Sequence, residues 1–168
     1  IEPADSLPLL LRGIDQSIRN AGDGISLAQT AEGALSQISS SVQRIREIAV
    51  QSSNATLEDR TGLQKEVDQL TQEISRIVQT TTFNGTSLFD VSGTSSLTFQ
   101  VGQDGNANNQ VSLTLSGMTG GLISAYASSL TATGTVNVSS AATASAALST
   151  LETDIDDISK QRATFGAV

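Results

Sequence analysis

The sequence predicts a mainly α-helical protein with a small β-hairpin, folded as an elongated antiparallel three-helix rod. Apolar residues recur in steps of three and four from Ile14 to Ala49, which is the period of one long amphipathic helix. The same period returns in 63–77 and in 141–158. At about 1.5 Å per residue the first helix is on the order of 50 Å long, more than the width of a compact domain of this size. Three such segments can bury their apolar seams together only by packing lengthwise, so a rod is expected.

The apolar seam of the first helix defines the expected core. Its members are Ile14, Ile18, Ala21, Ile25, Ala28, Ala31, Leu35, Ile38, Val42, Ile45 and Ala49. Four glycines, Gly13, Gly22, Gly24 and Gly33, interrupt the same helix. Each costs roughly 1 kcal/mol relative to Ala in a helix interior, which favours close approach of a neighbouring backbone.

The rest of the chain divides by its periodicity. Residues 1–81 hold the long helix and a second helix expected at 57–79, after a polar break. Residues 82–118 hold a β-hairpin, because alternating apolar residues at 97–101 and 111–115 flank a polar loop, with a short third strand possible at 88–91. Residues 119–140, rich in Gly, Ser, Thr and Ala, predict a surface connection. Residues 141–168 predict the helix that completes the rod.

Composition excludes several classes of function. Nine Lys and Arg against seventeen Asp and Glu give a net charge of -8, so a nucleic-acid partner is not expected. No apolar run is long enough to span a bilayer, so no membrane partner is expected. The chain has neither Cys nor His, which removes disulfides, the usual zinc sites and the commonest general base. We therefore expect no metal, no cofactor and no enzyme activity.

One group of acidic residues keeps an enzymatic alternative open. Asp154 and Asp157 can share a helix face, beside Asp156, and paired carboxylates are a catalytic device. Without a pocket signature, a solvated acidic face is the favoured interpretation. Three Asn-x-Ser/Thr triplets, at Asn54, Asn84 and Asn137, matter as glycosylation signals only on a eukaryotic secretory route.

A second stripe on the long helix is the candidate binding surface. Arg44, Ile48 and Gln51 lie about 120° from the seam, at about 100° per residue. An Arg beside an exposed aliphatic residue is typical of an interaction hot spot. The alternative is an isolated surface Ile, which is common.

Four blocks of this sequence resemble bacterial flagellins. They are SIRNAGDGISLAQTAEGAL (residues 17–35), QRIREIAVQS (43–52), TFNG (82–85) and IDDISKQRATFGA (155–167). The resemblance covers about residues 12–118 and 141–168 and implies the same helix, helix, hairpin, helix order. Residues 1–11, with Pro3 and Pro8, depart from the helical sequence usual in the family.

The resemblance implies a structural subunit of the extracellular flagellar filament, exported without a cleaved signal peptide. It implies a core rod-domain fragment without the terminal segments that polymerise and that pair with an export chaperone. A hook-filament junction protein of the same apparatus is the alternative, and the block at 43–52 favours flagellin. Other flagellin subunits are thus the expected partners.

The resemblance also implies a surface that Toll-like receptor 5 recognises. By motif, its residues would be Gln43, Arg44, Ile48, Gln51 and Glu66, and the same surface could serve contacts between stacked subunits. Leu70 stands where similar receptor-binding flagellins often carry Arg, which implies a weaker affinity. We expect replacement of Arg44 or Ile48 by Ala to weaken receptor binding without unfolding the rod.

Overall fold

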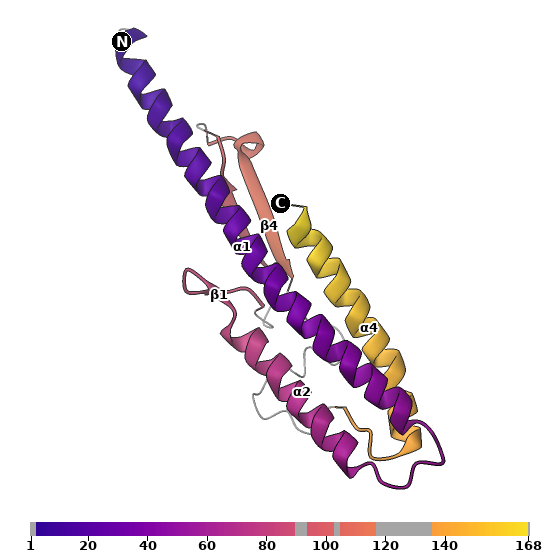
Figure 1. The fold of residues 1–168 in the computed structure, drawn as a ribbon. Coiled ribbons are helices and arrows are strands. Elements are labelled where there is room, and N and C mark those ends of the chain that lie inside the picture. The colour runs from indigo at the N-terminus through magenta and orange to yellow at the C-terminus, as the bar shows by residue number, and fades with distance from the viewer. Residues whose placement is uncertain (1–2, 90–93, 103–104, 117–135, 168) are drawn as a thin grey trace.

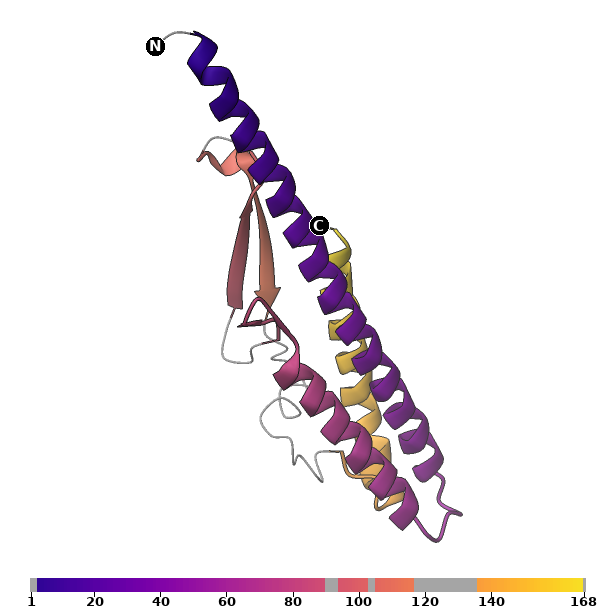
Figure 2. The same cartoon turned by 60° about the vertical axis from the view of Figure 1, so that its left-hand side comes forward.

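The computed structural model describes residues 3–89, 94–102, 105–116 and 136–167. Its elements are α1 (Pro3–Ser52), α2 (Thr61–Thr80), β1 (Thr82–Phe83), β2 (Thr86–Ser87), β3 (Thr94–Gln100), the 3₁₀ helix η1 (Ala107–Asn109), β4 (Gln110–Ser116) and α4 (Ala141–Gly166). Helix α1 runs the length of the molecule, and α2 and α4 both lie antiparallel to it along its C-terminal half (Figure 1). The β3–β4 hairpin lies against the other half (Figure 2). The predicted elongated three-helix rod is confirmed.

The core lies where α2 and α4 meet α1. Predicted seam residues from Ala28 to Ala49 are buried there, as are Val67, Ile74 and Ile77 of α2. Helix α4 adds Ala144, Leu151, Ile158 and Phe165. Burial of these apolar side chains is the main term that stabilises the bundle, at about 25 cal/mol per Å² of apolar surface.

The first half of the predicted seam is not buried. Ile14, Ile18 and Ile25 are exposed, and Ile18 keeps 65% of its surface accessible. Near the end of α4, Arg162 pairs with Glu32 at 3.4 Å, so the described part of α4 covers α1 only from about that level. The heptad spacing was correct for this half of α1, but the described helices do not cover it.

The connection between α1 and α2 is longer than predicted, because one side chain holds it as a loop. Helix α1 continues to Ser52, three residues past the end of the predicted seam. Arg60 donates from Nε to the Ser52 carbonyl at 3.0 Å, and from its terminal nitrogens to the carbonyls of Leu57 at 2.6 Å and Asn54 at 2.8 Å. These bonds satisfy carbonyls at the end of α1 and in the loop that no helix could satisfy.

Helix α2 begins at Thr61, not at the predicted Leu57. Asp59 precedes it and accepts a hydrogen bond from the backbone N–H of Thr61 at 2.9 Å. That bond to the ionised carboxylate lowers the pKa of Asp59. A lowered pKa stabilises the folded state fully above the ordinary pKa of Asp. This contribution is lost as the pH falls through the lowered pKa of Asp59.

A short hairpin that the sequence analysis did not predict follows α2. Strands β1 and β2 have two residues each and pair antiparallel around Asn84 and Gly85, whose φ angles are 49° and 80°. Strands this short carry no readable alternation. Leu88 and Phe89, predicted to start a third strand, are instead buried outside any strand, and Val91 lies beyond the described residues.

The β3–β4 hairpin confirms the predicted alternation, and its register pairs Leu97 with Leu113. It is attached to α1 by a hydrogen bond from Asn20 Nδ2 to the Gln100 carbonyl at 2.8 Å. The Phe99 ring packs over Gly24, where a Cβ would lie 3.5 Å from the ring. A Cβ at Gly24 would thus make an ordinary contact with a side chain, and a Cβ at Gly22 or Gly33 would meet nothing within 4 Å, so the expected close approach of a neighbouring backbone is wrong at these three glycines.

Residues 136–140 are packed more tightly than the predicted surface connection, whose earlier part lies outside the described residues. Val136 and Val138 are buried. Gln64 of α2 donates to the Val136 carbonyl at 2.9 Å and accepts from the Val138 N–H at 2.7 Å. Buried Ser52 donates to the Val138 carbonyl at 2.5 Å, and Ser140 caps α4. One segment thus ties the ends of all three helices together.

Replacing Gln64 by Ala should lower the free energy of unfolding by about 1 to 3 kcal/mol, because the backbone groups of Val136 and Val138 lose their partner. Urea unfolding measures the change. The matched control is Gln69→Ala on the exposed part of α2, expected within about 0.5 kcal/mol of wild type. Equal effects of the two changes would contradict the role given to Gln64.

Candidate contact surface

The structure separates the five predicted contact residues. Gln43, Arg44 and Gln51 are exposed on α1, and Glu66 of α2 is partly exposed. Ile48 has no accessible surface at all. The expectation that Ile48 is an exposed aliphatic residue on this stripe is wrong, because two helices pack on α1 and widen its buried sector until it includes Ile48.

Arg44 and Glu66 are brought together across the α1–α2 boundary. Arg44 Nε lies 2.7 Å from a carboxylate oxygen of Glu66, and a terminal nitrogen of Arg44 lies 3.0 Å from Glu47. The hydrogen bond to Glu66, then that to Glu47, raises the pKa of the Arg44 guanidinium. Exposed ion pairs add little to stability. The pair therefore matters mainly because it fixes where an Arg and a Glu are presented on the surface.

Val50, unlike Ile48, is an exposed apolar residue of α1. It keeps 49% of its surface accessible, whereas Ile48 keeps none. Both residues lie off the predicted seam, so sequence spacing could not say which of them a second helix would cover. Val50 lies four residues after Arg46 and seven after Gln43, so it shares their side of α1.

Gln43 lies on the α4 side of this face. It lines an open groove of about 580 Å³ between α1 and α4, together with Arg46, Glu47, Glu152, Ile155 and Asp156. An ion pair between Arg46 and Glu152 at 3.1 Å crosses from α1 to α4. The predicted residues therefore span two sides of α1: Gln43 faces the α4 groove, and Arg44 faces α2.

The acidic residues of α4 do not form a shared face. Asp154 is fully buried, Asp156 is exposed, and Asp157 lies 3.3 Å from Lys160 Nζ. The solvated acidic face favoured from the sequence is thus wrong for Asp154. Asp154 and Asp157 are also not presented together to solvent, which removes the geometry that the enzymatic alternative needed.

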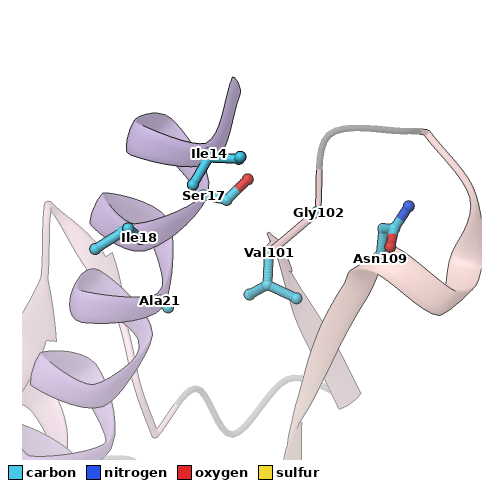
Figure 3. Close-up of a pocket in the computed structure, with 7 residues that line it drawn as sticks. All are labelled: Ile14, Ser17, Ile18, Ala21, Val101, Gly102 and Asn109. Atoms are coloured by element: carbon cyan, nitrogen blue, oxygen red, sulfur yellow. The ribbon is translucent and has the colours of Figure 1, made fainter. Parts of the chain in front are cut away.

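A second groove separates α1 from the loop that joins β3 to β4 (Figure 3). Its volume is about 380 Å³, and Ile14, Ile18 and Ala21 of α1 line one side of it while Val101 lines the other. Ser17 and Asn109 are polar, and none of the lining residues is charged. Such a groove is suited to apolar contact with another surface more than to fixing a polar ligand.

Neither a metal centre nor a membrane span is found within the described ranges. The residues placed there include no group of three carboxylates or other ligand side chains positioned to hold a metal ion. None of their helices combines the length and apolarity required to cross a bilayer.

These features define an elongated helical rod with exposed polar and apolar helix faces, an architecture used by structural and interaction proteins. Over residues 2–94 the chain matches the family described as bacterial flagellin N-terminal helical region. The chain belongs to the bacterial flagellin family.

Individual relatives agree. The chain is 55% identical to a flagellin of Halalkalibacterium halodurans over 82 residues, which are 48% of this chain and 30% of that protein. It is 50% identical to the B-type flagellin of Pseudomonas aeruginosa over 106 residues, which are 61% of this chain and 21% of that protein. The chain thus spans about a third or less of these curated relatives.

Solved structures extend the likeness to the fold. Bacillus cereus flagellin superposes with a TM-score of 0.71 and 31% identity, covering 89% of this chain and 81% of that one. FliC from Burkholderia pseudomallei gives a TM-score of 0.67 at 21% identity, covering 86% of this chain and 98% of that one. The second similarity supports the fold alone.

Because Ile48 is buried between helices, its replacement by Ala should cost about 2 to 5 kcal/mol of unfolding free energy. The earlier expectation that Ile48→Ala leaves the rod intact is therefore replaced by a loss of stability. Val50→Ala on the exposed side is the matched control, expected within about 0.5 kcal/mol of wild type. Thermal or urea unfolding of both variants would decide the point, and an unchanged Ile48→Ala would place the side chain at the surface.

Proposed function

We propose that this chain is the rod part of a flagellar filament subunit, with a structural and not a catalytic role. The observation that carries the proposal is the uncovered end of α1. Four leucines are exposed there, Leu7, Leu9, Leu10 and Leu11. The exposed apolar surface continues through Ile14 and Ile18. Contiguous apolar surface of this kind marks a site of protein contact.

The mechanism we propose is geometric. The covered half of α1 is fixed by α2 and α4, and the stiff helix carries its uncovered half away from that bundle (Figure 1). Identical rods that bind one another through different faces form an open helical assembly when the rotation from one rod to the next does not close a ring. On this proposal the partners are further flagellin subunits, the location is the extracellular filament, and an export chaperone binds a terminal segment of the whole protein.

We further propose that Toll-like receptor 5 recognises an exposed face of α1 that extends to Glu66 of α2 on one side and to the α4 groove on the other. Its contact residues are Gln43, Arg44, Gln51 and Glu66, supported by the 2.7 Å Arg44–Glu66 pair that holds two of them in place. Ile48 supports this face from beneath, because it is buried. The residues of this face are polar and exposed, so they can be changed without disturbing the core.

A chimera tests the filament role. In Halalkalibacterium halodurans cells whose own flagellin gene is deleted, a chimeric flagellin is expressed. In this chimera, residues 2–94 of the present chain replace the corresponding region of the Halalkalibacterium halodurans flagellin. Electron microscopy should show long filaments, as in a control that restores the original region. Secreted monomers without filaments would contradict the proposal, and short stubs at the hook would indicate the hook-junction role.

The receptor role is tested with Arg44→Ala. Binding to the purified receptor ectodomain should fall by about thirtyfold, the lower bound for a hot-spot residue. Arg76→Ala is the matched control, since Arg76 is as exposed as Arg44, with side-chain accessibilities of 54% and 49%, and is likewise paired with a carboxylate, Glu73. Equal binding by wild type and both variants would exclude Arg44 from the site, and an equal loss in both would point to charge alone.

A further inference from the structure

The asparagines of the three Asn-x-Ser/Thr triplets are all exposed, but they differ in the hydrogen bonds that their side-chain amides make. Asn54 Oδ1 accepts hydrogen bonds from the backbone N–H and the hydroxyl of Thr56, at 3.1 and 2.9 Å. Asn137 Oδ1 accepts the same two bonds from Ser139, at 2.9 and 2.6 Å. The structure gives the Asn84 amide no hydrogen bond to any of the residues that it describes. Asn84 is therefore the one of the three whose amide is unrestrained by an Asx turn.

Asn84 also differs in the residue that follows it. Gly85 has no Cβ, whereas Ala55 and Val138 follow the other two asparagines. The backbone nitrogen of a residue after Asn can attack the carbon of the Asn side-chain amide, and a Cβ on that residue hinders the approach. Asn84-Gly85 is the single Asn-Gly pair in the sequence.

We propose that Asn84 is a site of spontaneous deamidation, with Gly85 supplying the nucleophile and water as the only co-reactant. The Gly85 nitrogen forms a bond to the Asn84 side-chain carbon and gives its proton to solvent. The bond from that carbon to the side-chain nitrogen breaks, and this nitrogen takes a proton from solvent and leaves as ammonia. Water then opens the five-membered succinimide at either carbonyl, which gives aspartate or isoaspartate.

Opening of the turn controls the rate of this reaction. With φ angles of 49° and 80°, both residues occupy the left-handed conformation of a two-residue hairpin turn, which Asn-Gly favours. Ring closure requires Asn84 to leave that conformation. Only two residue pairs, Thr82 with Ser87 and Phe83 with Thr86, hold the strands together, and local structure this small opens readily.

Deamidation at Asn84 alters a hairpin that lies next to a contact between distant parts of the chain. Aspartate adds a negative charge to the turn, and isoaspartate also lengthens the backbone of a two-residue loop. Directly after this hairpin, Leu88 donates its N–H to the Thr81 carbonyl at 3.1 Å, and Leu88 and Phe89 are buried. The Phe89 ring meets Phe165 of α4 edge to face at 6.4 Å. Isoaspartate at Asn84 therefore loosens a contact between distant parts of the chain.

Peptide mapping by mass spectrometry tests the site. The whole chain is kept folded in warm, mildly alkaline buffer, and the exchange of amide nitrogen for oxygen is followed at all three asparagines. Asn84 should convert at least an order of magnitude faster than Asn54 or Asn137, with isoaspartate confirmed by enzymatic methylation. Equal rates at the three positions would overturn the proposal.

Two further comparisons test the control by the turn and its consequence. A linear peptide of residues 82–87 should deamidate faster than the folded chain, and equal rates would exclude control by the turn. Aged wild type should unfold at a lower temperature than Asn84→Asp aged in the same way, since Asp-Gly closes to the succinimide more slowly than Asn-Gly and the variant therefore contains less isoaspartate. Identical unfolding temperatures of the two proteins would exclude a loosening of the contact between Phe89 and Phe165.

Discussion

The structure depends on covering the apolar sector of α1. A helix of 50 residues cannot bury its own stripe, and a single partner helix would cover only a narrow seam. Here two helices, both antiparallel to α1, cover a sector wide enough to include Ile48 as well as the seam residues from Ala28 to Ala49. The elongated shape follows, because each partner gains apolar contacts only by lying along α1.

Polar contacts at one end of the rod set the register in which these helices pack. Apolar stripes with a repeating period permit several registers shifted by one or two turns. Arg60 holds the connection between α1 and α2, while Ser52 and Gln64 hold residues 136–138 before α4 begins. Surface pairs such as Arg46–Glu152 and Arg162–Glu32 fit the same register farther along α4. Each surface ion pair is weak, but both ion pairs and the hydrogen bonds at the end of the rod form together in one register of the three helices.

The sequence predicted the elements that have a long period and failed where tertiary contacts decide. The seam from Ala28 to Ala49 and the β3–β4 alternation needed only local spacing. Whether Ile18 and Ile48 are covered depends on where α2 and α4 lie against α1, and spacing along one helix cannot show that. Asp154 is buried for the same reason. Of the candidate surface, Arg44 was anticipated both from the second stripe on the long helix and from family resemblance, and its partner Glu66 from the resemblance alone.

The two halves of α1 have different roles that follow from this packing. In the covered half the side chains are fixed by neighbours from the same chain, so exposed polar residues such as Gln43 and Gln51 are held at constant positions. In the other half, which meets the β3–β4 hairpin but neither α2 nor α4, the leucines at 7–11 and Ile14, Ile18 and Ile25 stay exposed. Since α1 is one continuous helix, a contact made on its uncovered half is fixed in orientation relative to the polar face on the other. A rigid rod that exposes one apolar and one polar region in a fixed relation has the geometry that heterologous contacts in a repeating assembly can use.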